Sequence, residues 1–159
     1  RYWLMLEKES GGGPMMDFGC HRIEVFQNIA GPIKQTCSLT GNVLFDRQVE
    51  DTASALFQFE SGAQGVLSVS HAAGDPQDTL KIFGTEGSLH VENLNRGDLR
   101  IIAGGEETSE QHPPHANLHQ PLINDFTETL LQGREKPDVT GEMGRDVNVV
   151  LDEIYGRNR

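Results

Sequence analysis

The sequence predicts an α+β fold, in which a largely antiparallel, mixed sheet carries helices on one face and leaves the other face available for oligomerisation. Several segments between residues 33 and 103 alternate apolar and polar residues and are separated by glycine-containing turns, which is typical of antiparallel strands. Segments with helical spacing lie before and after this region. Separate runs of strands and helices are typical of α+β domains.

The composition is that of an ordinary globular chain. The 159 residues are 36% hydrophobic and 23% charged, so we expect residues 1–159 to form one domain with a packed core. A net charge of -11 argues against a surface for nucleic acid or for an anionic membrane. No apolar run approaches the roughly 20 residues that span a bilayer. The two cysteines, Cys20 and Cys37, form neither a disulfide framework nor a metal-binding spacing, so we expect a cytoplasmic protein without a metal site.

The stretch from Pro14 to Ala30 predicts the first helix. Proline suits the first helical turn, because its missing N–H has no helical partner there, and Gly31 followed by Pro32 ends the helix. Three glycines precede the helix, so another backbone or a ligand can approach its start closely. At 100° per residue one narrow stripe is polar, and the remaining faces are largely apolar, which predicts a mostly buried helix. The polar stripe contains Asp17, His21, Glu24 and Asn28.

The polar stripe has two interpretations. A stripe of this kind is most often only the solvated face of a helix. Asp17 and His21 are four residues apart, however, and side chains at that spacing touch on an α-helix. An aspartate that orients an imidazole is a recurring device of acid–base catalysis. The spacing alone leaves both a catalytic pair and a surface pair open.

The period-two segments follow the helix in chain order. In residues 53–60 the side chains of Ala53, Phe57 and Phe59 share one face, and that of Leu56 lies on the other. Apolar residues on both faces predict that the side left uncovered by helices is an interface between copies. The expected strands are residues 33–40, 53–60, 63–71, 79–83, 88–92 and 99–103.

The last third of the chain predicts a loop and two helices. Residues 104–117 are polar, and we expect a surface loop with solvated histidines. A helix from Pro121 to Gln132 ends at Gly133. A final helix runs from Gly141 toward Tyr155 and is capped by Thr140.

Five motifs follow one another along nearly the whole chain. They are Gly11-Gly12-Gly13 with Asp17-x-Gly19-x-His21-x-x-Glu24, Val49-Glu50-Asp51-Thr52-Ala53 with Phe59-Glu60-Ser61-Gly62-Ala63, Ile82-Phe83-Gly84-Thr85-Glu86-Gly87-Ser88-Leu89, and the stretches 121–134 and 139–155. In this order and at these separations they resemble the C-terminal domain of the Gfo/Idh/MocA oxidoreductases, the relatives of glucose-fructose oxidoreductase and inositol dehydrogenase.

The resemblance implies reversible hydride transfer between NAD or NADP and a sugar, a polyol or a related hydroxyl or carbonyl compound. It implies that Asp17 and His21 are catalytic, with His21 moving the proton of the hydroxyl being oxidised and Asp17 orienting His21 and binding substrate. Glu24 stands where the family often has a substrate-contacting aspartate. His71 lies where the family often places a substrate-facing loop, so both residues are expected to bind substrate.

The resemblance also implies an N-terminal Rossmann domain, which binds NAD or NADP through most of the cofactor contacts. That domain is an expected partner of this one. No part of that domain is found in the 159 residues, so the cofactor-binding residues stay unknown and we expect this segment alone to be inactive. A homo-oligomer built through the sheet face is expected as well. The alternative is a non-catalytic binding or dimerisation module that keeps the fold without the chemistry. A small hydrolase that uses Asp17 and His21 is a third interpretation, but no activated nucleophile supports it.

Overall fold

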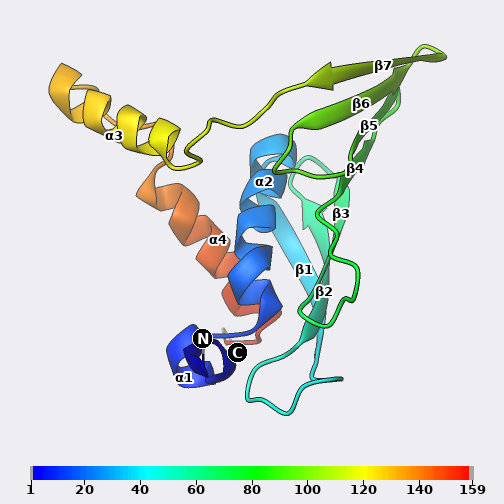
Figure 1. Ribbon diagram of the computed structural model, residues 1–159, viewed down its shortest axis with the longest axis vertical. Helices are drawn as coiled ribbons and strands as arrows, with labels where there is room; N and C mark the ends of the chain where they lie inside the picture. The colour runs from blue at the N-terminus through cyan, green and yellow to red at the C-terminus, as the bar shows by residue number, and fades with distance from the viewer. Residues whose placement is uncertain (1, 158–159) are drawn as a thin grey trace. The chain divides into compact units, whose positions relative to one another are not determined.

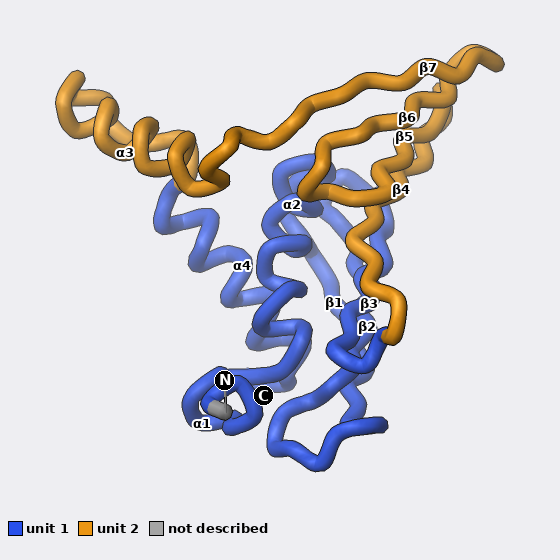
Figure 2. The backbone as a smooth tube through the Cα atoms, in the orientation of Figure 1, with its two compact units in different colours: residues 1–73, 140–159 blue, residues 74–139 orange. Residues whose placement is uncertain are grey.

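The computed structural model describes residues 2–157, which fold into two compact units (Figure 2). Unit 1 contains the described residues up to Ala73 and from Thr140 onward, and unit 2 contains Gly74–Val139. Each unit holds one antiparallel sheet, and both contain helices, which confirms the predicted α+β class. No helix in the described part of the chain is long and apolar enough to cross a membrane.

Unit 1 combines a three-stranded sheet with helices from both ends of the chain (Figure 1). Two short helical segments lie within residues 2–10, for which the sequence made no assignment. The elements of the unit are η1 (Tyr2–Met5), α1 (Glu7–Ser10), η2 (Met15–Gly19), α2 (Cys20–Ala30), β1 (Ile33–Gly41), β2 (Thr52–Phe59), β3 (Gln64–Ser70) and α4 (Gly141–Ile154).

The sheet of unit 1 has the order β1-β2-β3, and both strand pairs are antiparallel. Ala55 in the central strand lies opposite Ser38 of β1 and Leu67 of β3. Along β2 the side chains alternate strictly between buried and exposed, with Leu56 on the exposed side. The face assignment made from the period-two pattern is therefore confirmed.

The core of unit 1 lies between the buried face of this sheet and the helices. Figure 1 shows α2 and α4 on the same side of β1, β2 and β3, with the other side of the sheet uncovered by either helix. The hydroxyl of Ser38 donates to the carbonyl oxygen of Ile154 at 2.8 Å, which ties the end of α4 to β1. The buried apolar cluster comprises Met15, Ile23, Ala53, Ala55, Phe57, Phe59, Leu67, Val69, Val147, Val150, Leu151 and Ile154.

The first predicted helix is present over the expected residues, but it begins differently. Its first turn, η2, is a π-helical turn, in which the N–H of Cys20 donates to the carbonyl oxygen of Met15 five residues earlier. Gly31 ends the helix at a φ of 87°, as predicted. The helix is less buried than predicted, because Phe18 and Ile29 are about half exposed.

Unit 2 contains a second meander and one helix. Its four-stranded sheet has the order β4-β5-β6-β7, so the strands form two hydrogen-bonded sheets rather than the single sheet expected. The helix α3 (Gln120–Gln132) ends at Gly133 with a φ of 65°, and its predicted extent is confirmed to within one residue. The strands are β4 (Leu80–Phe83), β5 (Gly87–Val91), β6 (Asp98–Ala103) and β7 (Glu106–Gln111).

The prediction of a loop over residues 104–117 was wrong for its first half. There β7 pairs with β6 across a turn at Gly104 and Gly105, which have φ values of 60° and 83°. All six side chains of β7 are exposed, so the strand needs no apolar alternation and leaves no period-two signal in the sequence.

Candidate functional site

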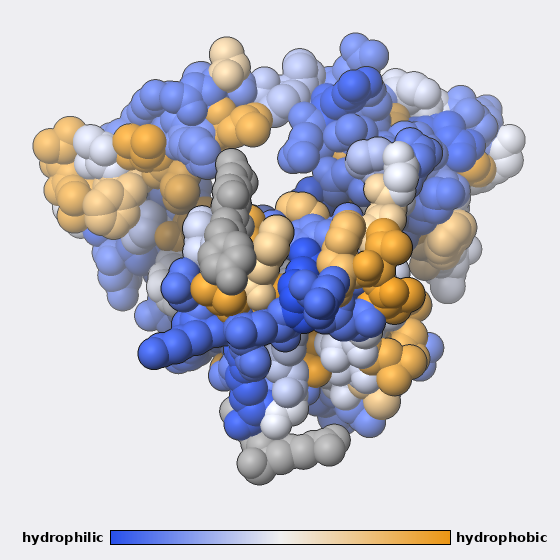
Figure 3. Space-filling view, turned by 60° about the horizontal axis from the view of Figure 1, so that its bottom comes forward, coloured by the Kyte–Doolittle hydropathy of each residue, from blue (hydrophilic) through white to orange (hydrophobic). Residues whose placement is uncertain are grey.

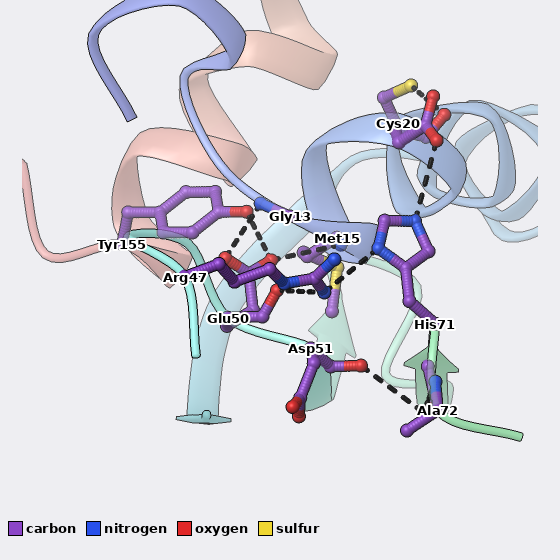
Figure 4. Close-up of polar contacts among 11 residues, drawn as sticks. Gly13, Met15, Cys20, Arg47, Glu50, Asp51, His71, Ala72 and Tyr155 are labelled. Atoms are coloured by element: carbon purple, nitrogen blue, oxygen red, sulfur yellow. Dashed lines mark hydrogen bonds and ion pairs between the residues drawn. The ribbon is translucent and has the colours of Figure 1, made fainter. Parts of the chain in front are cut away.

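A buried carboxylate holds the start of the first long helix. Glu50, which is 9% exposed, accepts hydrogen bonds from the N–H of Gly13 at 2.8 Å and from the N–H of Met15 at 3.2 Å. The hydroxyl of Tyr155, just after α4, donates to the same carboxylate at 2.7 Å (Figure 4). The first N–H groups of a helix lack helical partners and carry partial positive charge, so a carboxylate there is doubly favourable.

Gly12 and Gly13 lie where these groups come too close for a side chain. A Cβ atom on Gly13 would lie 1.9 Å from the carbonyl oxygen of Glu50, and a Cβ on Gly12 would lie 2.2 Å from the hydroxyl oxygen of Tyr155. Neither glycine has a positive φ, so close approach rather than backbone conformation excludes a side chain. The close approach predicted at this helix start is made by Glu50 and Tyr155 of the same chain.

Burial and the hydrogen bond to Glu50 raise the pKa of the Tyr155 phenol well above its usual value. The phenol therefore stays a neutral donor across the physiological pH range. This fixes the direction of its hydrogen bond to the carboxylate, which links α4 to the helix start.

A second buried carboxylate orders the loop between β1 and β2. The side chain of Asp51 is fully buried and accepts from the N–H groups of Val43 at 3.0 Å, Leu44 at 2.6 Å and Phe45 at 2.9 Å. These backbone N–H groups, that of Val43 foremost, lower the pKa of Asp51 below its usual value. The ionised carboxylate thereby closes the loop that carries Arg47.

Asp17 lies in the π-helical turn, beside a histidine from the end of β3. Its Oδ2 is 3.5 Å from Nε2 of His71, and Nδ1 of His71 is 3.0 Å from an Nη of Arg47. The ring of Phe18 meets the imidazole of His71 edge-on, with centroids 5.0 Å apart. The side chain of Asp17 is 40% exposed and that of His71 is 18% exposed, so the carboxylate faces solvent while the imidazole lies largely behind it.

The structure places Asp17 against His71 rather than against His21. Within residues 2–157 the Asp17 carboxylate contacts His71, and the side chain of His21 is exposed. A π turn holds one residue more than an α turn, so residues 17 and 21 do not stack in the i,i+4 register that α-helical spacing gives. Further along, Glu24 accepts a hydrogen bond from the side chain of Asn28, and that part of the stripe follows α-helical spacing.

The site offers a carboxylate and an exposed imidazole on one short stretch of helix. A carboxylate accepts hydrogen bonds from hydroxyl groups, and an imidazole can accept and donate a proton in acid–base catalysis. The strand pairs of the described residues are antiparallel, and none forms the strand–turn–helix unit that holds a dinucleotide pyrophosphate. In the same part of the chain no group of three or more His, Cys, Asp or Glu side chains is placed to hold a metal ion.

The sequence prediction gave no role to Arg47, Glu50 or Tyr155. One signal for a buried acid was present. Asp51 lies two residues before the first inward-facing residue of β2, so the same alternation points its side chain toward the core. No local pattern marks Arg47 or Tyr155. Their partners are distant in sequence, with Tyr155 lying 105 residues from Glu50.

Comparison with known proteins identifies relatives along the chain. The sequence profile described as the GFO/IDH/MocA C-terminal domain matches residues 1–90. Trans-1,2-dihydrobenzene-1,2-diol dehydrogenase of Xenopus laevis is 27% identical over 108 residues, which make up 68% of this chain and 32% of that protein. Myo-inositol 2-dehydrogenase of Thermotoga maritima is 23% identical over 145 residues, 84% of this chain and 43% of that protein.

Solved structures share the fold over nearly the whole chain. The aldose-aldose oxidoreductase from Caulobacter crescentus, complexed with glycerol, superposes with a TM-score of 0.85 at 22% identity, covering 99% of this chain and 49% of that one. Levoglucosan dehydrogenase in complex with NADH and levoglucosan gives a TM-score of 0.85 at 17% identity, with 97% and 50% covered. The chain spans about a third to a half of the length of these relatives.

Proposed function

The chain belongs to the GFO/IDH/MocA family through its C-terminal domain, and from that premise we propose that it is the substrate-side domain of an NAD(P)-dependent oxidoreductase. The substrate we propose is a sugar, a polyol or a related ring compound with a hydroxyl or carbonyl group. The names of the relatives support this class, since they act on an inositol, a dihydrodiol, aldoses or levoglucosan.

The observation that carries the proposal is the setting of Asp17. It is a half-exposed carboxylate in a π-helical turn whose start is held by the buried Glu50. π turns are frequent at functional sites, and a fixed carboxylate at a solvent edge suits the binding of a substrate hydroxyl. Two further side chains are candidates for substrate binding. One is His71, which lies against Asp17, and the other is Glu24, one turn beyond His21.

We assign proton transfer at the reacting hydroxyl to His21. Its imidazole is exposed and makes no hydrogen bond or ion pair within residues 2–157, so its nitrogens are available to a substrate. General acid–base catalysis by a positioned side chain contributes about 10²–10⁴ in rate. Oxidation of a hydroxyl group needs this proton removed as the hydride leaves for the nicotinamide, and the cofactor supplies the hydride acceptor.

NAD or NADP belongs, in this proposal, to a Rossmann domain outside these residues. The described strands offer no fold for the pyrophosphate, so we derive no cofactor contact from them. The apolar side of α3 is compatible with a domain partner, because its hydrophobic side chains are strongly exposed and gather on one helix (Figure 3). These side chains are Leu122, Ile123, Phe126, Leu130 and Leu131.

We also propose self-association through the uncovered face of the β1-β2-β3 sheet. Leu39, Leu56 and Val66, one from each strand, are 80%, 57% and 67% exposed on that face. Apolar residues that project from the middle of a sheet and meet only water are typical of an interface. The proposed occupant is the same face of a second copy of the chain.

The test of the proposed function is an assay of the complete protein that carries these residues. We expect NAD⁺ or NADP⁺ to be reduced in the presence of at least one member of a panel of aldoses, inositols and cyclic diols. Asp17→Asn should slow turnover and raise KM, because it removes the charge that accepts the substrate hydroxyl. A folded complete protein that reduces neither cofactor with any of these compounds would favour the non-catalytic module.

A further inference from the structure

We propose that Arg47 is a positioning residue, which fixes the tautomer of His71 and thereby aims the ring N–H of His71 at the Asp17 carboxylate. The inference deepens the proposed function, since it rests on Asp17 as a site residue. The names of the relatives say nothing of Arg47, and no sequence pattern indicates a role for it.

Three contacts form a chain from the loop to the helix. One Nη of Arg47 donates to the carbonyl oxygen of Glu50 at 2.8 Å and lies 3.0 Å from Nδ1 of His71 (Figure 4). The opposite nitrogen of the same imidazole, Nε2, lies 3.5 Å from Oδ2 of Asp17. The imidazole therefore stands between a guanidinium and a carboxylate, with one ring nitrogen toward each.

The chemistry of the two neighbours decides where the ring proton lies. A guanidinium has five N–H donors, no acceptor, and stays protonated in proteins. Its contact with Nδ1 is therefore a hydrogen bond only when Nδ1 is unprotonated and accepts. The ring proton of His71 is then on Nε2, the nitrogen that lies 3.5 Å from the carboxylate of Asp17, and an ionised carboxylate only accepts. Both contacts select the same tautomer.

The neighbours of Arg47 hold it in place. Its own carbonyl oxygen accepts from the side chain of Asn42, and its guanidinium lies 5.2 Å from the ring centroid of Phe45. The loop itself is closed by the three backbone hydrogen bonds of Asp51. An arginine anchored in this way presents its donor in one direction, unlike a solvated surface arginine.

The assignment gives the two histidines different tasks. Nδ1 of His71 is occupied by Arg47, and Nε2 carries a proton, so His71 orients the carboxylate and does not accept a proton from substrate. The ring of Phe18 also packs edge-on against the imidazole of His71. The accepting imidazole nitrogen of the site is left to His21.

The test is the protonation pattern of the His71 ring, read by long-range ¹H–¹⁵N correlation on the complete protein labelled with ¹⁵N-histidine. We expect a single tautomer at neutral pH, with the proton on Nε2 and a bare Nδ1. A proton on Nδ1, whether in the other tautomer or in a doubly protonated ring, would overturn the inference. This measurement needs no variant and no substrate.

Arg47→Met removes the donor while keeping a long side chain. In the folded variant we expect His71 to lose its single tautomer and populate both neutral forms, while the ring signals of His112, which lies in unit 2, stay unchanged. An unchanged His71 pattern in that variant would show that Arg47 is not the determinant. Failure of the dehydrogenase assay would count against the proposed function, whereas the tautomer of His71 is measured without substrate and tests the role of Arg47 alone.

Discussion

At the scale of single residues, the site depends on buried carboxylates more than on the helix that displays it. Glu50 satisfies two backbone N–H groups and one phenol, and Asp51 satisfies three backbone N–H groups. A buried acid without such partners costs several kcal/mol, so each partner is needed. The position of Asp17 is thus set by groups that are largely buried.

Gly13 tests this arrangement most sharply. Replacing it with alanine places a Cβ 1.9 Å from the backbone oxygen of Glu50. Because the clashing atom belongs to the backbone, no side-chain rotation can remove the clash. We expect Gly13→Ala to lower the free energy of unfolding by about 3 kcal/mol or more, as overpacking against a fixed backbone does at its upper end. Chemical denaturation of the chain measures this change.

The matched control is Gly144→Ala in the first turns of α4. A Cβ there meets nothing within 4 Å, and the residue has no positive φ. We expect this change to raise the free energy of unfolding by about 0.5–1 kcal/mol, because alanine loses less backbone entropy in a helix than glycine. Equal effects of the two substitutions would show that close approach is not what requires Gly13.

At the scale of elements, local sequence signals predict where a helix begins and ends better than they predict which residues contact one another. Pro14, Gly31 and Gly133 bound their helices as expected, because proline and glycine act through their own backbone chemistry. The π turn at Met15–Gly19 leaves no such signal. Gly19 permits it in part, since a Cβ there would lie 2.5 Å from the sulfur of the buried Met15.

The missed contacts of the site have the same cause. The stripe of Asp17 and His21 was predicted by assuming 100° per residue, and the π turn breaks that assumption at this point. Arg47 and His71 meet because β2 and β3 form a hairpin that returns the chain beside the loop. Periodicity places residues on faces, but pairs that are joined through tertiary structure need the coordinates.

At the scale of the whole molecule, the surfaces to which we assign different roles lie in different units. Unit 1 holds the candidate site and the uncovered sheet face, and unit 2 holds α3. The division at Ala73 and Thr140 was not predicted, because period-two segments lie on both sides of Ala73 and Thr140 lies between two predicted helices. Which strands bond to one another is a tertiary property that alternation alone does not specify.

Self-association is the prediction that belongs to this scale. We expect the chain to sediment as a dimer or larger species at micromolar concentration, and Leu56→Lys to shift it to the monomer by placing a charge on the uncovered face. The control is Phe83→Lys, which puts the same charge on a 74% exposed apolar site in the other sheet. A wild-type monomer, or dissociation by the control as readily as by Leu56→Lys, would count against the interface.

In the function that we propose, His21 moves the proton of a dehydrogenase reaction. The most direct test of this role is the steady-state kinetics of His21→Ala in the complete protein, beside the exposed control His112→Ala. His21 is exposed, so its replacement should change the free energy of unfolding by no more than about 0.5 kcal/mol. We predict that kcat of His21→Ala falls by about 10²–10⁴ with cofactor affinity nearly unchanged, and that the control keeps wild-type kinetics. A wild-type kcat in His21→Ala would contradict the claim.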